Sequence, residues 1–375
     1  MQQSKQQQLT AISTTTTTTI TTSNASFVFW LIQNANTLFS STINPLRNVV
    51  WKIFWFLNHQ PIYMDFTKQC LQKNNTNSVF SVAFHPSFPL LATGSDTNST
   101  ILYDLTTSPP TVKYHFKHHD GWTWSVAFHQ HLPFFATGSA DNSTILYDIS
   151  ILPPTIKCHF KHHTSYVFSV AFHPNLPLFA TGSDDHSTIL YDISTSPPTM
   201  KHHLKHHTQS VFSVAFHSSL PLLATGSCDH SIILYDISTS PPTIKCHLKH
   251  HTQSVWSVAF HPSLPLLATG SADKSTILYD LTTSPPTVQH HFKYHTSYVM
   301  FVTFHLSLPL LATGSVDNSI ILYDISNICT STPTVKHHFE NHTANILSIA
   351  FHSSLPLLAT GFNNNTTILY NLDKM

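Results

Sequence analysis

HHTQSVWSVAFHPSLPLLATGSADKSTILYDL, from His250 to Leu281, decides the fold, because near-copies of this stretch fill the chain from Ser81 onward. The copies begin at steps of 44 residues, and an insertion near Cys329 lengthens the last step to 47. Their first residues are Ser81, Ser125, Ser169, Ser213, Ser257, Phe301 and Ser348. A repeat of this length predicts an array of small structural units, none of which can bury its apolar face alone.

Each copy contains four segments with the composition of short β-strands. In the fifth copy, residues 255–261 (VWSVAFH) form a run of β-branched and aromatic residues that we expect to be strand a. Residues 264–270 (LPLLATG) and 275–281 (STILYDL) are expected to be strands b and c, and residues 243–251 (TIKCHLKHH) of the preceding copy a strand d. The Ser/Thr-Pro-Pro segments between c and d lack backbone donors and predict loops. Each copy should therefore form one antiparallel sheet of four strands.

Glycine is rare in this chain and recurs at one position of the repeat. Seven of the eight glycines occupy one repeat position, at the end of strand b. These are Gly94, Gly138, Gly182, Gly226, Gly270, Gly314 and Gly361. We expect the backbone there to need a conformation that other residues resist.

The stretch from His250 to Leu281 resembles a tryptophan–aspartate (WD) repeat. That family opens each repeat with Gly-His and closes strand c with Trp-Asp, where this chain has His-His and Tyr-Asp in nearly every copy. The resemblance extends through all seven copies, which stay in phase. It implies an all-β fold, a seven-bladed β-propeller of four-stranded antiparallel blades.

The resemblance also implies a hydrogen-bond network within each blade. In the family, this network joins a His before strand a, a Ser or Thr of strand b, an Asp of the next turn and the Trp of strand c. Carried over to the second to sixth copies, with Tyr in place of Trp, the implied residues are His119, Thr137, Asp141 and Tyr147; His163, Thr181, Asp185 and Tyr191; His207, Thr225, Asp229 and Tyr235; His251, Thr269, Asp273 and Tyr279; and His295, Thr313, Asp317 and Tyr323. The first copy departs with Asn75 and Thr97 in place of His and Asp, and the last with Asn364 and Asn371.

The two ends of the repeat array complement each other. The last copy stops after strand c, at Tyr370 and Asn371, so its blade lacks a strand d. Residues 68–80 (KQCLQKNNTNSVF) align with the d segments, with Cys70 in the position of Cys246. We therefore expect this segment to complete the seventh blade and leave no open edge in the ring.

The first 60 residues differ in composition from the propeller predicted for residues 61–375. Residues 1–25 are rich in Gln and Thr and hold too little apolar surface to fold. The apolar run VVWKIFWFL, residues 49–57, is shorter than the roughly 20 residues that span a bilayer, but it suits docking at a membrane interface or on a partner. We interpret residues 1–60 as an accessory extension, with docking and organelle targeting as alternatives.

The composition argues against several classes of function. Charged residues make up 9% of the chain and the formal net charge is zero, whereas nucleic-acid binding needs a basic patch. Every copy repeats the same Ser, His and Asp, whereas an active site needs one differentiated arrangement. The histidines that end strand a should lie too far apart to share a metal ion. We therefore expect no enzyme activity, no cofactor, no bound metal and no nucleic-acid partner.

The loop between strands d and a varies most among the copies, and a partner would be distinguished there. The predicted contact residues are Trp122, Tyr166, Tyr298, Gln209 and Gln253. Bulky neighbours in strand a, such as Trp124 and Trp256, are expected instead to pack between blades. The Ser-Pro and Thr-Pro steps between c and d are expected to be rigid spacers, with phosphorylation or recognition of extended proline segments as alternatives.

Family resemblance implies a rigid platform for partner proteins. We expect a non-catalytic scaffold or adaptor that presents its loop faces to proteins. The alternative is a membrane-peripheral structural protein held by residues 49–57. Cys70, Cys158 and Cys246 recur at one repeat position on alternate blades, which suits a reducing, cytoplasmic setting. The many histidines predict a loss of stability between about pH 7 and 5.

Overall fold

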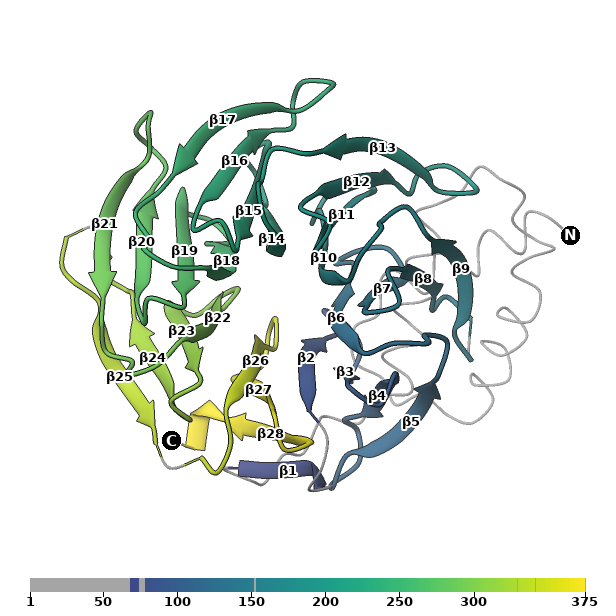
Figure 1. The fold of residues 1–375 in the computed structure, drawn as a ribbon. Coiled ribbons are helices and arrows are strands. Elements are labelled where there is room, and N and C mark those ends of the chain that lie inside the picture. The colour runs from purple at the N-terminus through teal and green to yellow at the C-terminus, as the bar shows by residue number, and fades with distance from the viewer. Residues whose placement is uncertain (1–67, 74–77, 152, 329, 341, 375) are drawn as a thin grey trace, which may run out of the picture. The chain divides into compact units, whose positions relative to one another are not determined.

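The structure is a computed structural model that describes residues 68–73, 78–151, 153–328, 330–340 and 342–374. These residues form seven four-stranded antiparallel sheets arranged as blades around a ring (Figure 1). In each blade, strand a lies nearest the centre of the ring and strand d at its rim (Figure 1). The predicted seven-bladed β-propeller is confirmed. The predicted boundary between residues 60 and 61 and the apolar run 49–57 lie outside the described residues.

The strands of the first four blades follow the chain in the order a, b, c, d. Blade 1 comprises β2 (Val79–Phe84), β3 (Leu90–Ser95), β4 (Thr100–Asp104) and β5 (Thr111–Phe116). Blade 2 comprises β6 (Thr123–Phe128), β7 (Phe134–Ser139), β8 (Thr144–Asp148) and β9 (Thr155–Phe160). Blade 3 comprises β10 (Val167–Phe172), β11 (Leu178–Ser183), β12 (Thr188–Asp192) and β13 (Thr199–Leu204). Blade 4 comprises β14 (Val211–Phe216), β15 (Leu222–Ser227), β16 (Ile232–Asp236) and β17 (Thr243–Leu248).

Blades 5 and 6 repeat this order, and blade 7 draws its fourth strand from the other end of the chain. Blade 5 comprises β18 (Val255–Phe260), β19 (Leu266–Ser271), β20 (Thr276–Asp280) and β21 (Thr287–Phe292). Blade 6 comprises β22 (Val299–Phe304), β23 (Leu310–Ser315), β24 (Ile320–Asp324) and β25 (Thr334–Phe339). Blade 7 comprises β26 (Ile346–Phe351), β27 (Leu357–Phe362), β28 (Thr366–Asn371) and β1 (Lys68–Lys73), and the 3-10 helix η1 (Leu372–Lys374) follows β28.

Burial changes from the inner strands to the rim, and the sequence of each strand follows it. Every residue of β15 is buried, which matches its composition of Leu, Ala, Thr, Gly and Ser. In β17, at the rim of the same blade, only Leu248 is buried, and Lys245 and His247 are among the exposed residues. The composition of each repeated segment therefore indicates how far its strand lies from the centre of the ring, as well as that it forms a strand.

The apolar core is divided into clusters that lie between neighbouring blades. One of them packs Ala180 and Leu190 of blade 3 against Val211, Phe216 and Tyr235 of blade 4. Another packs Leu357 and Leu369 of blade 7 against residues of blade 1. Each blade thus buries its face only against its neighbour, as the repeat length indicated.

The repeated glycines serve close packing, and the expectation of an unusual backbone conformation is wrong. No glycine in the described part of the chain has a positive φ. A Cβ added to Gly226 would lie 2.9 Å from Val255 Cγ1 and 3.0 Å from Val258 Cγ1, on strand a of the next blade. Positive φ values occur instead in the b–c turns, for example at Asn98 (57°) and Asn142 (65°). Glycine therefore lets adjacent blades approach each other.

The exchange of strands that closes the ring is confirmed. Strand β1 pairs antiparallel with β28, with Lys68 opposite Tyr370 (Figure 1). In β1 the β-bulge lies between Cys70 and Gln72, which is a different position along the strand from the bulge in blade 4. Cys70 is exposed as a result, and Leu71 packs on the core cluster between blades 7 and 1. The aligned position of Cys70 therefore does not fix which residue faces the core.

Among the described residues, no helix has both the length and the apolar character to cross a membrane.

Candidate functional site

Loops between strands d and a and turns between strands b and c lie at the same end of the ring, which we call the d–a face. Backbone hydrogen bonds join the two within a blade. Ala140 N donates to Trp122 O at 2.8 Å in blade 2, and Asp184 N donates to Tyr166 O at 2.8 Å in blade 3. These bonds hold the d–a loops in fixed positions on the sheets.

An arc of aromatic rings crosses the d–a face. Phe80, Trp124, Phe168, Phe212 and Trp256 come from strand a of five consecutive blades, and each is half-buried. Successive ring centroids lie 4.1, 5.3, 5.1 and 4.1 Å apart, so each ring is in contact with the next. The strand-a aromatics pack between blades, as expected, and form a firm base beneath the d–a loops.

The residues predicted to contact a partner lie on these loops and face solvent. Trp122, Tyr166 and Tyr298 are 47%, 46% and 43% exposed. The side chains of Gln209 and Gln253 are also exposed, while their backbone carbonyls accept hydrogen bonds from the hydroxyls of the b–c turns. Trp122 and Tyr166 belong to adjacent blades 2 and 3, whereas Tyr298 belongs to blade 6. Gln209 and Gln253 belong to blades 4 and 5 between them, so the predicted set spans five consecutive blades of one face.

A second set of predicted residues forms hydrogen-bonded groups inside blades 2 to 6. In each blade the His Nδ1 lies 2.8–3.0 Å from the Asp Oδ2, and the His Nε2 lies 2.7–2.8 Å from the Thr hydroxyl. Burial alone would raise the pKa of Asp185, but hydrogen bonds from His163 and Ser187 outweigh burial and hold that pKa below its ordinary value. The Asp also accepts a hydrogen bond from the backbone of the d–a loop, as Thr164 N donates to Asp185 Oδ2 at 3.0 Å. The groups therefore fix the loop that carries the exposed aromatics.

In several blades the tyrosine of strand c contacts the first histidine of the His-His pair. In blades 2, 3 and 4 the Tyr hydroxyl lies 3.2–3.3 Å from Nδ1 of the first histidine of the His-His pair. In blade 6, Tyr294 takes the place of that histidine, and the buried hydroxyl of Tyr323 has no hydrogen-bond partner among the described residues. In blade 5 the rings of His250 and Tyr279 lie 5.5 Å apart without such a bond.

The implied place of these tyrosines in the His–Thr–Asp groups stays a prediction, and the contact with the first histidine of the pair in blades 2 to 4 is one that the resemblance did not imply. The phenol hydroxyl lies at the far end of the ring, where it meets the neighbouring histidine. In blades 2 to 4, the two departures from the family pattern, His for Gly and Tyr for Trp, contact each other. Sequence comparison treated them as separate differences.

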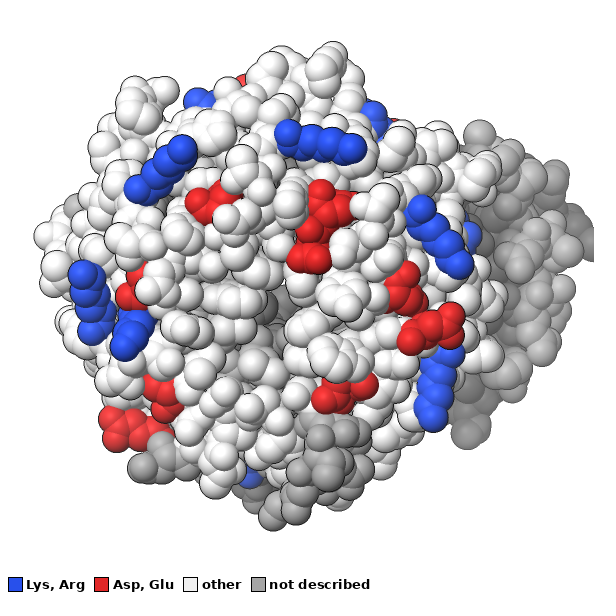
Figure 2. All heavy atoms as spheres, in the orientation of Figure 1, with Lys and Arg blue, Asp and Glu red and all other residues white. Residues whose placement is uncertain are grey.

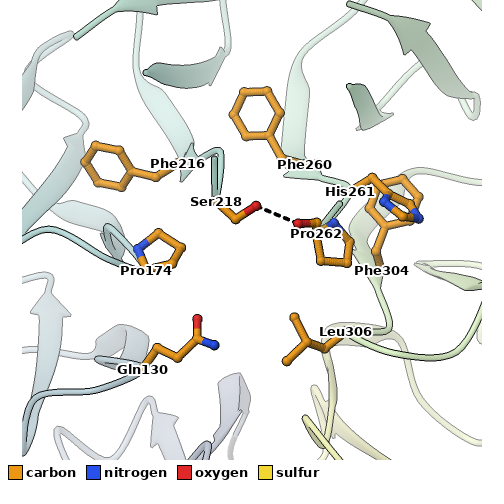
Figure 3. Close-up of a pocket in the computed structure, with 9 residues that line it drawn as sticks. All are labelled: Gln130, Pro174, Phe216, Ser218, Phe260, His261, Pro262, Phe304 and Leu306. Atoms are coloured by element: carbon orange, nitrogen blue, oxygen red, sulfur yellow. Dashed lines mark hydrogen bonds between the residues drawn. The ribbon is translucent and has the colours of Figure 1, made fainter. Parts of the chain in front are cut away.

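The opposite end of the ring, where strands a and b are joined, has a small pocket. Its volume is about 180 Å³, and its lining includes Phe216, Phe260, Phe304 and Pro174 (Figure 3). Ser218 Oγ donates a hydrogen bond to the carbonyl of Pro262 at 2.5 Å, so one of its few polar groups is already satisfied (Figure 3). The pocket is an apolar recess.

Comparison with models of known protein families shows which family the chain belongs to. The model of the WD domain, G-beta repeat, matches residues 68–104, 110–148, 154–192, 198–236, 242–280, 286–324 and 333–371. The chain is a WD-repeat protein. No curated protein matches it. WD-repeat propellers are typically interaction scaffolds that bind proteins and are usually non-catalytic.

The first blade of the WD propeller replaces the His–Thr–Asp group. Thr97 stands where blades 2 to 6 have Asp, and its hydroxyl lies 2.6 Å from both Ser95 Oγ and Ser99 Oγ. Asn75 lies outside the described residues. A chain of hydroxyls thus holds the b–c turn of blade 1.

The seventh blade of the WD propeller uses its histidine differently. His342 Nε2 bonds to the hydroxyl of Tyr370 at 2.5 Å, and Nδ1 lies 3.0 Å from the carbonyl of Asn318 in blade 6. His342 aligns with the network histidines, but Asn364 removes the carboxylate. Sequence analysis did not single it out.

The histidines that end strand a form a belt of contacts between the WD blades, which the sequence analysis also missed. Each packs against the last phenylalanine of strand a in the next blade, with ring centroids 5.0–5.3 Å apart. The belt histidines are His85, His129, His173, His217, His261, His305 and His352. The regular spacing of His and Phe in every copy was the available signal.

The hydrogen bonds of the belt histidines require neutral rings. His261 Nδ1, for example, accepts from the backbone N–H groups of Ser263 and Leu264 at 3.1 and 2.9 Å, and the other six make the same pair of bonds. A nitrogen that accepts carries no proton. Burial lowers the pKa of all seven, to about 3 for His85 and to about 4 for His129, His261 and His352. The belt is a structural element of the a–b loops.

Proposed function

We propose that the protein is a non-catalytic interaction scaffold that binds partner proteins through its d–a face. The observation that carries this proposal is the exposure of Trp122, Tyr166 and Tyr298 on loops whose sequence differs between otherwise similar blades. Large aromatic side chains bury much apolar surface on binding and are enriched among residues that dominate interface energies.

Rigid support strengthens this proposal. The loop of Tyr166 is fixed by Asp185, which accepts from Thr164 N, and by Ser183 Oγ, which donates to Ser165 O at 3.2 Å. A side chain that is already held in place loses less conformational entropy when a partner binds. The d–a face therefore carries its aromatic side chains on loops whose backbone is held in place before binding.

A pull-down with quantitative mass spectrometry tests the proposal. Wild-type protein is compared with the Trp122→Ala, Tyr166→Ala, Tyr298→Ala triple variant. A matched control removes exposed apolar side chains from strands d at the rim, with Val112→Ala, Ile156→Ala and Val335→Ala. Circular dichroism and the thermal midpoint establish that both variants fold.

We expect the triple variant to lose the partner that wild type and the rim variant retain. Partner capture that is unchanged in the folded triple variant contradicts the proposal. Equal loss in both variants also contradicts it, because binding would then follow general surface hydrophobicity.

A further inference from the structure

Acidic residues and exposed aromatics coincide on one sector of the d–a face. The d–a loops of blades 2 and 3 and the b–c turns of blades 1 to 3 contain no Lys or Arg over residues 95–99, 118–123, 139–143, 162–166 and 183–187. The same segments contain Asp96, Asp120, Asp141, Asp184 and Asp185. Figure 2 views this face and shows acidic side chains nearer its centre and lysines nearer its rim. Trp122 and Tyr166 stand on the same loops.

A hydrogen bond between blades brings two of these acids to one junction. Asn98 Nδ2, in the b–c turn of blade 1, donates to the carbonyl of Asp120 in the d–a loop of blade 2 at 3.0 Å. Asp96 lies two residues before Asn98, and Trp122 two residues after Asp120. The Asp120 side chain is exposed. The turn with Asp96 and the loop with Trp122 therefore meet where blades 1 and 2 adjoin.

Three aromatic rings stand at this junction. The ring of Trp122 lies 5.7 Å from that of Phe80 and 5.6 Å from that of Trp124, measured between centroids. Phe80 and Trp124 lie 4.1 Å apart. Trp122 is supported from beneath by two rings and presents its remaining surface to solvent.

One oxygen of Asp96 lacks the donor that its counterpart in blade 3 has. Asp96 Oδ2 accepts from Ser78 N at 2.7 Å, whereas Oδ1 is buried with no hydrogen-bond partner among the described residues. The repeat counterpart of Asp96 is Asp184, whose Oδ1 accepts from Ser210 Oγ of the next blade at 2.6 Å. Trp122 occupies the repeat position of Ser210 and has no hydroxyl. A buried carboxylate oxygen without a donor destabilises the folded chain, and a donor from outside would relieve this.

We propose that this junction binds a lysine or arginine side chain in a basic segment of the partner protein. The cation packs against the ring of Trp122, and its N–H groups donate to Asp96 Oδ1 and to the carboxylate of Asp120. Rotation of the exposed Trp122 side chain opens the path to Asp96, and such rotations of surface residues are fast. This inference rests on the proposed function and specifies the chemistry of the segment that the d–a face recognises.

Fluorescence anisotropy with the full chain tests the site, using a fluorescein-labelled hexa-arginine peptide as the probe and a hexaglutamate peptide for comparison. We expect the arginine peptide alone to bind, with an affinity that falls as the salt concentration rises from about 50 to about 200 mM. The Asp96→Asn, Asp120→Asn variant should bind roughly tenfold more weakly, because two charge-assisted hydrogen bonds are lost. Trp122→Ala should weaken binding roughly threefold or more, and Trp122→Phe should restore part of the loss.

Two controls make the test specific to the junction. Asp236→Asn with Asp280→Asn removes the same charge from the opposite end of the ring, and Tyr294→Ala removes an exposed aromatic that lies outside the proposed contact set. Both should leave the affinity within about twofold of wild type, because exposed charges beyond a Debye length are screened. An equal loss in the Asp236/Asp280 variant, or wild-type affinity in the Asp96/Asp120 variant, overturns the proposal.

The failure of this site can be told apart from the failure of the scaffold proposal. If the aromatic triple variant loses its partner while the Asp96/Asp120 variant keeps both the partner and the arginine peptide, the cation site is wrong and the scaffold stands. If the affinity for the arginine peptide depends on Asp96, Asp120 and Trp122 but the aromatic triple variant captures the partner as wild type does, the cation site stands and the scaffold proposal fails. Thermal midpoints within a few degrees of wild type ensure that each variant is compared in its folded state.

Discussion

His352 of the seventh blade packs edge-on against Phe84 of the first, with ring centroids 5.2 Å apart. This contact closes the belt of seven His–Phe contacts at the junction between the last blade and the first. Strand β1 completes the same blade from the outside by pairing with β28. The ring is therefore closed both near its centre and at its rim, and the two closures use different parts of the repeat.

The belt predicts that stability falls as pH drops from about 6.5 to about 4. The pKa values of the belt histidines are lowered chiefly by burial, to about 4 for His261 and about 3 for His85. The unfolded chain therefore binds more protons in this range, and stability rises with pH. The loss begins at the unfolded value near 6.5 and ends below the folded values. Urea midpoints at pH 7.5, 6.0 and 4.5 should fall in that order.

A variant isolates the contribution of the belt to this pH dependence. His261→Asn keeps a side-chain acceptor for the two backbone N–H groups but does not titrate, so the midpoint should change less between pH 7.5 and 4.5 than in wild type. A midpoint that is flat with pH in wild type would show that the belt histidines keep ordinary pKa values in the folded state.

The His–Thr–Asp groups predict a specific loss of stability. Asp185→Asn should lower the free energy of unfolding by about 1–3 kcal/mol, because Asp185 accepts from His163, Thr164 and Ser187 and an amide cannot replace all three contacts. The pKa of Asp185 is held below its ordinary value, so its contribution is lost as pH falls below about 3.8. The free energies come from urea unfolding at pH 7.5.

Asp192→Asn supplies the matched control for this loss. Asp192 is in the same blade, and its carboxylate accepts hydrogen bonds from the backbone and hydroxyl of Ser194 at the exposed start of a c–d loop. Its replacement should change the free energy of unfolding by less than about 0.5 kcal/mol. Similar effects of the two substitutions would contradict a structural role for the buried group.

The strand exchange predicts a sharp difference between two truncations. Deleting residues 1–60 leaves β1 intact and should leave the thermal midpoint nearly unchanged. Deleting residues 1–76 removes β1 and exposes the edge of β28, so the midpoint should fall by roughly 5 °C or more. Equal midpoints, measured by differential scanning calorimetry, would rule out a stabilising role for the exchange.

The close approach of blades 4 and 5 predicts that Gly226→Ala destabilises the protein. The added methyl group would meet Val255 and Val258 at 2.9–3.0 Å, and overpacking of this kind costs about 1–3 kcal/mol. Combining it with Val255→Ala should cost less than the sum of the two single changes, because the second substitution makes room for the first. Strict additivity in a double-mutant cycle of urea unfolding would disprove the steric explanation.

The sequence predicted those parts of the fold that follow from the repeat, because every copy carries the same strand pattern. Seven in-phase copies fixed the number of blades, and the missing strand d after Asn371 identified the exchange with residues 68–73. The bulge at Leu71 could not be predicted, because it depends on which of Cys70 and Leu71 the core cluster accepts. The role of the glycines was also misjudged, since the reason for them lies in the neighbouring blade, at Val255 and Val258.

The candidate site was predicted less completely than the fold. The loops of Trp122, Tyr166 and Tyr298 stood out because they break the repetition. Contacts between two blades could not be recognised in the sequence, because a single copy holds only one of the two residues in each contact. The unpaired oxygen of Asp96 illustrates this, as it becomes visible only when Trp122 is compared with Ser210 across two blade junctions.

Hydrogen–deuterium exchange of the full chain, alone and with its captured partner, tests most directly the claim that the d–a face binds proteins. Our account predicts slower exchange on binding in residues 118–124 and 162–168, which carry Trp122 and Tyr166, and unchanged exchange in the a–b loops at residues 129–134 and 217–222. Slower exchange confined to the a–b loops, with residues 118–124 and 162–168 unchanged, would contradict it.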